Sequence, residues 1–167
     1  MAIKIFISYS NEDRNKMLSL RKRIDVHSSL TAIVVANERS ASKLLTDKVK
    51  DGISDSAYVV CILTNKSIKN QWVNQEIGYA TALGKPIRPI VMTGVLNKLK
   101  GFVHKQMDLP YSVKSTGVSV RAEAVLFSKR AKVLVDDILV EHRFVPQEVG
   151  LESLFPGVWY REQPSIG

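Results

Sequence analysis

Four apolar, strand-like runs alternate with helical patterns along the first half of the chain. The strand-like runs cover residues 3–9, 30–35, 58–63 and 85–92. Apolar residues at helical spacing lie between them, over residues 11–24, 42–53 and 71–83. Strands that alternate with helices over short connections form a parallel sheet with right-handed crossovers. We therefore expect an α/β fold, a three-layer sandwich in which a parallel sheet of four to five strands carries helices on both faces.

The fourth strand-like run contains Pro86 and Pro89. Because proline cannot donate to a ladder, these residues predict either an edge strand or a strand start. Gly84 closes the preceding helix as a left-handed residue. Farther along, the pattern predicts a short helix at 95–103, an extended stretch at 107–111 and a long helix at 122–140.

The composition fits one globular domain. The chain has 167 residues, of which 45% are hydrophobic, enough for a substantial core. We expect a domain over residues 1–143, and an extension over residues 144–167 that packs on it because it is rich in aromatic residues and proline. No apolar run approaches the ~20 residues that cross a bilayer, and the chain starts without a signal-peptide pattern. We therefore expect a cytoplasmic protein that does not contact the membrane.

The charge and the missing motifs exclude several classes of protein. The formal net charge is +8, which attracts polyanions, but the basic residues are scattered and no nucleic-acid-binding motif accompanies them. Specific nucleic-acid binding is therefore not expected. No GxxxxGK[ST], GxGxxG or GxSxG motif is present, and the histidines are isolated. Cys61 lies in the most apolar strand and is interpreted as a buried hydrophobic residue. We expect neither a metal site nor a bound cofactor.

Polar residues follow two of the predicted strands. Ser8, Tyr9 and Ser10 end the first strand, and Trp72 and Glu76 lie on the helix after the third. Residues four apart share one face of a helix, and the carboxyl ends of parallel strands open into the crevice where ligands bind. Glu76 is therefore a candidate for chemistry. The alternative is that the glutamate is favourable only for the helix dipole and that the tryptophan belongs to the core.

Ser10 and Asp13 allow more than one interpretation. A serine followed by acidic residues is typical of a helix N-terminus. The aspartate is therefore interpreted as a helix-terminal charge in preference to a catalytic partner. The serine is interpreted equally as a helix cap or as a ligand-binding group.

The segment from Ile7 to Ser10, the aspartate Asp13 and the pair Trp72 and Glu76 together resemble the Toll/interleukin-1 receptor (TIR) domain family. The first strand of that family commonly ends in an ISYS-like segment with an aspartate shortly after it, and its enzymatic members carry a WxxxE pattern. The match covers roughly residues 3–140 and implies a flavodoxin-like fold. Residues 37–40 lack the proline and glycine of many members, and this short loop looks more like stand-alone bacterial or archaeal members.

The resemblance implies cleavage of the nicotinamide–ribose bond of NAD. The products would be nicotinamide and ADP-ribose or a cyclic ADP-ribose-type signal, in prokaryotic antiviral immunity. NAD would be the substrate, so the reaction needs no cofactor. Since nicotinamide leaves as a neutral molecule, no strong acid is required, and one carboxylate, Glu76, could stabilise the oxocarbenium charge on the ribose.

Other residues would then bind the substrate. Trp72 or Tyr79 could wall the nicotinamide, and the loop of Ser8, Tyr9 and Ser10 together with Arg39 could hold the remaining polar groups. In this family active sites are often completed by a loop of a neighbouring copy, here residues 36–40, so self-association through TIR–TIR contacts is expected.

Two other functions fit the same pattern. The first is a non-catalytic TIR module that assembles with like domains in signalling. The second is a flavodoxin-like nucleoside-processing enzyme with another substrate, because a fold does not fix a function. A carboxylate at Glu76 beside a usable pocket would favour the enzyme over the scaffold.

Overall fold

The computed structural model describes residues 1–35, 43–99 and 107–142. Contacts divide the chain into two compact units, Met1–Lys132 and Val133–Gly167. The first unit carries the sheet and all the candidate residues that the structure describes. The expected domain end at residue 143 and the expected packing of residues 144–167 lie outside the described residues.

A five-stranded sheet forms the centre of the first unit. Its strand order is β2-β1-β3-β4-β5, and every neighbouring pair is parallel. The strands are β1 Ile3–Ser8, β2 Leu30–Ile33, β3 Tyr58–Leu63, β4 Ile87–Met92 and β5 Tyr111–Val113. This is the flavodoxin-like order of a doubly wound α/β fold. The expected fold class is therefore confirmed.

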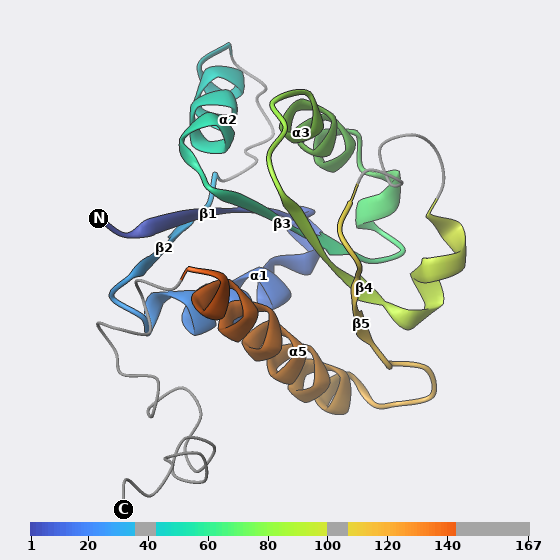
Figure 1. The fold of residues 1–167 in the computed structure, drawn as a ribbon. Coiled ribbons are helices and arrows are strands. Elements are labelled where there is room, and N and C mark those ends of the chain that lie inside the picture. Colours follow the sequence, from blue (N-terminus) through green and yellow to red (C-terminus); the bar gives the residue numbers. More distant parts are fainter. Residues whose placement is uncertain (36–42, 100–106, 143–167) are drawn as a thin grey trace, which may run out of the picture. The chain divides into compact units, whose positions relative to one another are not determined.

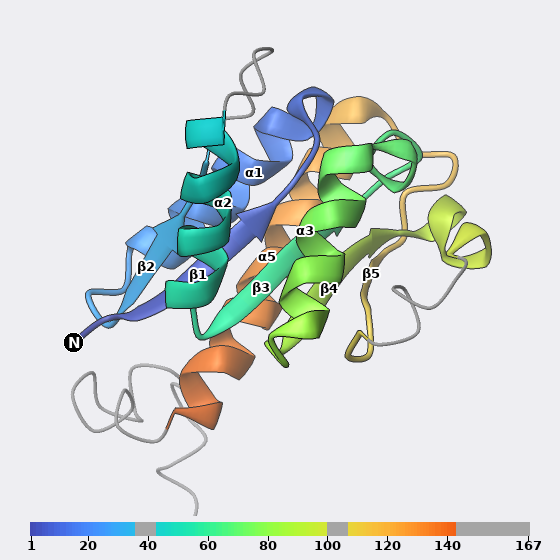
Figure 2. The same ribbon diagram turned by 90° about the horizontal axis from the view of Figure 1, so that it is seen from above.

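Helices cover both faces of this sheet. They are α1 Arg14–Asp25, α2 Lys43–Asp55, α3 Gln71–Ala82 and α5 Val120–Glu141, with short 3-10 helices η1 Asn11–Asp13, η2 Ser67–Lys69 and η3 Thr93–Lys98. Figures 1 and 2 show α2 and α3 together on one face, and α1 with the part of α5 that belongs to the first unit on the other. Among the described residues, no helix has the length and apolar composition needed to cross a membrane.

The central strand β3 is buried along its whole length. Its sequence is continuously apolar because helices cover both faces of a parallel sheet. Cys61 in this strand is fully buried, which confirms its interpretation as a hydrophobic core residue.

Side-chain alternation in β1 determines which layer its last residue faces. A Cβ added to Gly52 in α2 would lie 3.1 Å from Cε2 of Phe6, so the ring of Phe6 points toward the layer of α2 and α3. Since residues two apart in a strand share a face, Ser8 at the end of β1 points toward the same layer. The strand therefore brings a hydroxyl group to α3.

The position of β4 differs from the sequence prediction. The strand lies between β3 and β5, so of the two predicted alternatives the edge strand is wrong, whereas Pro86 does lie directly before the strand start at Ile87. The N–H of Asp108 donates to the carbonyl of Ile87 at 3.1 Å, which shows that Ile87 and therefore Pro89 face the β5 side. The β4–β5 pairs begin only at Ile90 with Tyr111. The N–H that Pro89 lacks would thus precede the ladder.

Several element ends also differ from the predicted ones. The stretch expected as a helix from residue 95 is the 3-10 helix η3, Thr93–Lys98, and the fifth strand lies at Tyr111–Val113 instead of residues 107–111. The final helix starts at Val120, two residues earlier than expected. Gly84 has φ of 67°, which confirms the predicted left-handed end of α3.

The two helical glycines Gly52 and Gly78 predict opposite effects of a change to alanine. At Gly52 the new methyl group would meet the buried ring of Phe6 at 3.1 Å and Cγ2 of Ile33 at 3.3 Å. Gly52→Ala should therefore lower the free energy of unfolding by about 1 kcal/mol, overpacking outweighing the helix-propensity gain. At Gly78 nothing lies within 4 Å, so Gly78→Ala should raise it by about 0.5–1 kcal/mol.

Denaturant titration of the two variants against the wild type measures both effects. Equal stabilities for the two variants would contradict the close packing of α2 on β1.

Candidate active site

The candidate site lies at the carboxyl ends of β1 and β3. These two strands are neighbours, while β2 pairs with β1 on the opposite side. The chain therefore adds β2 on one side of β1 and the later strands on the other side, so the order of the strands reverses between β1 and β3. Open α/β sheets bind ligands at such a reversal point. Ser8 is the last residue of β1, and Glu76 lies on α3, the first α-helix after β3.

A buried carboxylate occupies this point. Glu76 is only 4% exposed, and its Oε2 accepts a hydrogen bond from Oγ of Ser8. Across residues 1–35, 43–99 and 107–142, no cation lies within ion-pair distance of it. A carboxylate removed from water without a cation is costly, so this arrangement destabilises the ionised form.

Because it is buried, the carboxyl group of Glu76 binds its proton more tightly than an exposed glutamate does. Burial raises the pKa of Glu76 from 4.5 to about 7, although the hydrogen bond from Ser8 acts in the lowering direction. Burial also raises the pKa of Tyr9; the nearby Arg14 lowers it, and the charge of Glu76 adds to the increase. The pKa of Cys61 is raised by burial, with a smaller contribution from Glu76. At neutral pH the carboxyl group is therefore present in both protonation states.

The start of α3 fixes the direction of Glu76. Oδ1 of Asn70 accepts hydrogen bonds from the backbone N–H of Trp72 at 2.9 Å and of Val73 at 3.3 Å, as an N-cap residue does. The indole of Trp72 is half-buried one turn before the glutamate. Sequence reasoning missed Asn70, although an asparagine directly before a helical pattern is an N-cap signal.

The structure brings together some of the predicted site residues and separates others. Ser8 and Glu76 are in contact. Tyr9 directly follows Ser8 in the sequence and is buried. The hydroxyl group of Tyr79 lies 3.4 Å from Oγ of Ser54 in α2, so it contacts a different element. Arg39 lies outside the described residues.

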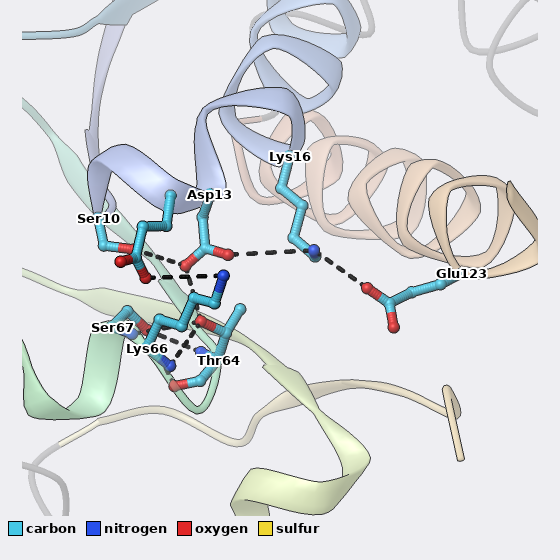
Figure 3. Close-up of polar contacts among 8 residues, drawn as sticks. Ser10, Asp13, Lys16, Thr64, Lys66, Ser67 and Glu123 are labelled. Carbon is cyan, nitrogen blue, oxygen red and sulfur yellow. Dashed lines mark hydrogen bonds and ion pairs between the residues drawn. The ribbon is translucent and has the colours of Figure 1, made fainter. Parts of the chain in front are cut away.

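A second buried group of polar side chains lies at the same edge of the sheet (Figure 3). We call it the Asp13 cluster, and it consists of Ser10, Asp13, Thr64 and Ser67. Oδ2 of Asp13 accepts hydrogen bonds from Oγ of Ser10 and from Oγ1 of Thr64, each at 2.7 Å. Neither Ser10 nor Asp13 makes a side-chain cap to a helix backbone. Ser10 stands at the N-cap position of η1, but its hydroxyl group binds Asp13 and does not cap the helix.

Sequence reasoning also missed Thr64. The threonine follows the last residue of the buried strand β3 directly, as Ser10 follows β1 closely. Both residues therefore reach the carboxyl edge of the sheet, and the rule that selected Ser8 would have selected Thr64 as well.

A polar cleft of about 350 Å³ opens beside the Asp13 cluster. Lys16 crosses it, with its Nζ 3.1 Å from Oε1 of Glu123 and 4.0 Å from Oδ1 of Asp13. Lys66 pairs with Glu12 at 3.8 Å. Within the part of the chain that the structure describes, no group of three or more histidine, cysteine or acidic residues could hold a metal ion.

Comparison with known families identifies the domain. The sequence model of the TIR domain family matches residues 5–111 of the chain, a range that contains every described candidate residue. The chain therefore belongs to the TIR domain family. Among curated proteins, none matches the sequence.

Two solved structures with TM-scores above 0.5 agree on the fold. A protein from Salmonella typhimurium LT2 named as sugar-binding has a TM-score of 0.56 at 12% identity, over 85% of this chain and 39% of that one. The sugar isomerase domain of an RpiR transcription factor from Sphaerobacter thermophilus has a TM-score of 0.53 at 10% identity, over 90% and 76%. The TIR domains of the Roq1 resistosome, which recognises the pathogen effector XopQ, have a TM-score of 0.47 at 12% identity, over 81% and 84%.

Burial of Glu76 predicts a specific dependence of stability on pH. Because the carboxyl group has a higher pKa in the folded chain than its ordinary 4.5, the folded state holds a proton that the unfolded state has lost. The free energy of unfolding should therefore fall as pH rises from 4.5 to about 7, by roughly 3 kcal/mol in total. Glu76→Gln removes this component.

Denaturant titration between pH 4.5 and pH 8 tests this prediction. The stability of Glu76→Gln relative to the wild type should increase steadily with pH and level off above about 7. Glu141→Gln, at an exposed glutamate at the end of α5, controls for the loss of one negative charge. Parallel curves for Glu76→Gln and the wild type would show that the carboxylate is not desolvated.

Proposed function

We propose that this TIR domain cleaves the nicotinamide–ribose bond of NAD, with Glu76 as the catalytic residue. The observation that carries the proposal is the burial of this carboxylate against Ser8 at the carboxyl ends of β1 and β3. The products would be nicotinamide and either ADP-ribose or a cyclic ADP-ribose-type signal. The reaction would serve prokaryotic antiviral immunity.

The chemistry requires a negative charge more than a proton donor. Breaking the bond to the cationic pyridinium moves positive charge onto the ribose, and nicotinamide leaves as a neutral molecule. A carboxylate below the sugar stabilises that charge most strongly where water is excluded. Glu76 meets this requirement, because its pKa of about 7 leaves part of the population ionised at neutral pH. The positive charge of bound NAD would favour the ionised form further.

The cost of burying Glu76 supports an enzyme over a non-catalytic scaffold. An ionised carboxylate buried without a cation lowers the stability of the domain, and residues that lower stability are typical of active sites. An interaction module would have no use for this side chain at the reversal point of the sheet. Glutamine at this position would keep the shape and avoid the cost.

The remaining candidate residues would bind the substrate. Trp72 is half-buried and lies one turn before Glu76, so its ring could wall the nicotinamide. Ser8 would keep the carboxylate in place, and its neighbours Tyr9 and Ser10 could contact the ribose. Tyr79 would need to turn away from Ser54 to contact the same substrate.

Glu76→Gln tests the proposal directly, because the change keeps the size of the side chain and removes its charge. Purified protein is incubated with NAD, and the products are separated by mass. The wild type should release nicotinamide, and the variant should lose at least ~10²-fold in turnover, as when one electrostatic stabiliser is removed from an active site.

The matched control is Glu141→Gln, the same chemical change at an exposed position, which should turn over NAD at the wild-type rate. A folded Glu76→Gln protein that retains more than about a tenth of wild-type turnover would rule out the catalytic assignment.

Self-association would contribute to the site if the segment of residues 36–40 completes the active site of a neighbouring copy. The specific activity should then be low in dilute protein and rise as the protein is concentrated. Arg39→Glu should suppress this rise in protein that still folds. Lys22→Glu, an equal charge reversal at an exposed residue of α1, should leave the rise intact.

A flat specific activity over a hundredfold range of concentration, in active protein, would show that one copy carries a complete site.

A further inference from the structure

We propose that Asp13 is a positioning residue that holds the loop after β1 and the loop after β3 together, and so fixes the separation of Ser8 and Glu76. Its effect on NAD cleavage rests on the function proposed above, whereas its effect on the geometry does not. Asp13 would act through other residues, without touching the substrate.

The carboxylate of Asp13 joins the two loops by direct hydrogen bonds. Its Oδ2 accepts one from Ser10, in the loop after β1, and one from Thr64, in the loop after β3, each at 2.7 Å. All three residues are buried. Because a buried hydroxyl group without an acceptor is unfavourable, removing the carboxylate would leave both hydroxyl groups to find new partners, and the two loops would separate.

The first loop leads directly to Ser8. Ser10 is two residues beyond it, and the backbone N–H of Asp13 donates to the carbonyl of Ser10 at 2.8 Å. The aspartate therefore holds both the side chain and the main chain of Ser10. Only Tyr9 separates this fixed point from the residue that donates to Glu76.

The second loop leads to α3. Oγ1 of Thr64 accepts the backbone N–H groups of Lys66 and Ser67, both at 3.2 Å, and Oγ of Ser67 accepts the N–H of Thr64 at 2.7 Å. The N–H of Asn70, the N-cap of α3, donates to the carbonyl of Ser67 at 3.0 Å. A continuous series of hydrogen bonds thus runs from the aspartate to the helix that carries Glu76.

The role of the acceptor can be separated from the role of the charge. Asp13→Asn keeps one oxygen that can accept both hydroxyl groups and loses the charge that faces Lys16 at 4.0 Å. Asp13→Ala loses the acceptor and the charge together. The difference between these two variants therefore isolates the hydrogen bonds.

Thr64 offers a second pair of variants. Thr64→Val keeps the shape and removes the hydroxyl group, and Thr64→Ser keeps the hydroxyl group. This pair leaves the charge of Asp13 in place and tests the whole series of hydrogen bonds from Asp13 to α3, because Oγ1 of Thr64 also accepts the N–H groups of Lys66 and Ser67. It keeps the proposal testable if Asp13→Ala does not fold.

The readout is the titration of the Glu76 carboxyl group in the full chain, followed by its ¹³C chemical shift and assigned with Glu76→Gln. Ser8, whose hydrogen bond acts on the pKa of this carboxyl group, and Tyr9 and Cys61, on which its charge acts, are the same in every variant. We expect the midpoint in Asp13→Ala to differ by at least about half a pKa unit from that in Asp13→Asn, because the burial of Glu76 changes. Thr64→Val should differ likewise from Thr64→Ser.

The turnover of NAD gives a second readout. It should fall at least about tenfold in Asp13→Ala and Thr64→Val at saturating substrate, and stay within about threefold of the wild type in Asp13→Asn and Thr64→Ser, because small displacements of a catalytic group are costly. Midpoints that agree within each pair would overturn the positioning role. A wild type that titrates as expected but releases no nicotinamide would overturn the proposed function and leave the positioning role standing.

Discussion

The burial of one carboxylate against one hydroxyl group is the interaction on which the candidate site depends. Ser8 reaches Glu76 because β1 lies next to β3 and because the side chains of β1 alternate between the two helical layers. The strand order places the carboxyl ends of β1 and β3 at the reversal point of the sheet. The core supplies the low polarity that raises the pKa of Glu76. The strand order and the apolar core that form the sheet therefore also determine the position and the pKa of Glu76.

Much of the fold could be predicted from the sequence because the strands and helices have strong, separate periodicities. The third strand has the predicted bounds, Tyr58–Leu63, since a continuous apolar run of this length in an α/β chain is buried on both faces. The place of β4 could not be predicted. Proline forbids a ladder bond on one side only, and Pro89 is tolerated because the N–H that it lacks would precede the β4–β5 ladder, whose first pair is Ile90 with Tyr111.

The candidate site was predictable in part for a similar reason. Position at a strand end selects Ser8, and the family pattern selects Glu76; both are properties of the chain order. The partners of Asp13, Ser10 and Thr64, were not predictable as a pair. The threonine lies 51 residues farther along the chain than the aspartate to which it donates. Tyr79 has helical spacing to Glu76, but spacing does not tell which neighbouring element a side chain contacts.

The fully buried Cys61 has a practical consequence. It is the sole cysteine of the chain, it has no exposed surface, and its raised pKa keeps the thiol protonated. Reagents that attack thiolates react slowly with such a group. A cysteine introduced on the surface could therefore be labelled selectively with a fluorophore or a spin label in the otherwise natural protein, which would allow association between copies to be followed as a change in distance between labels.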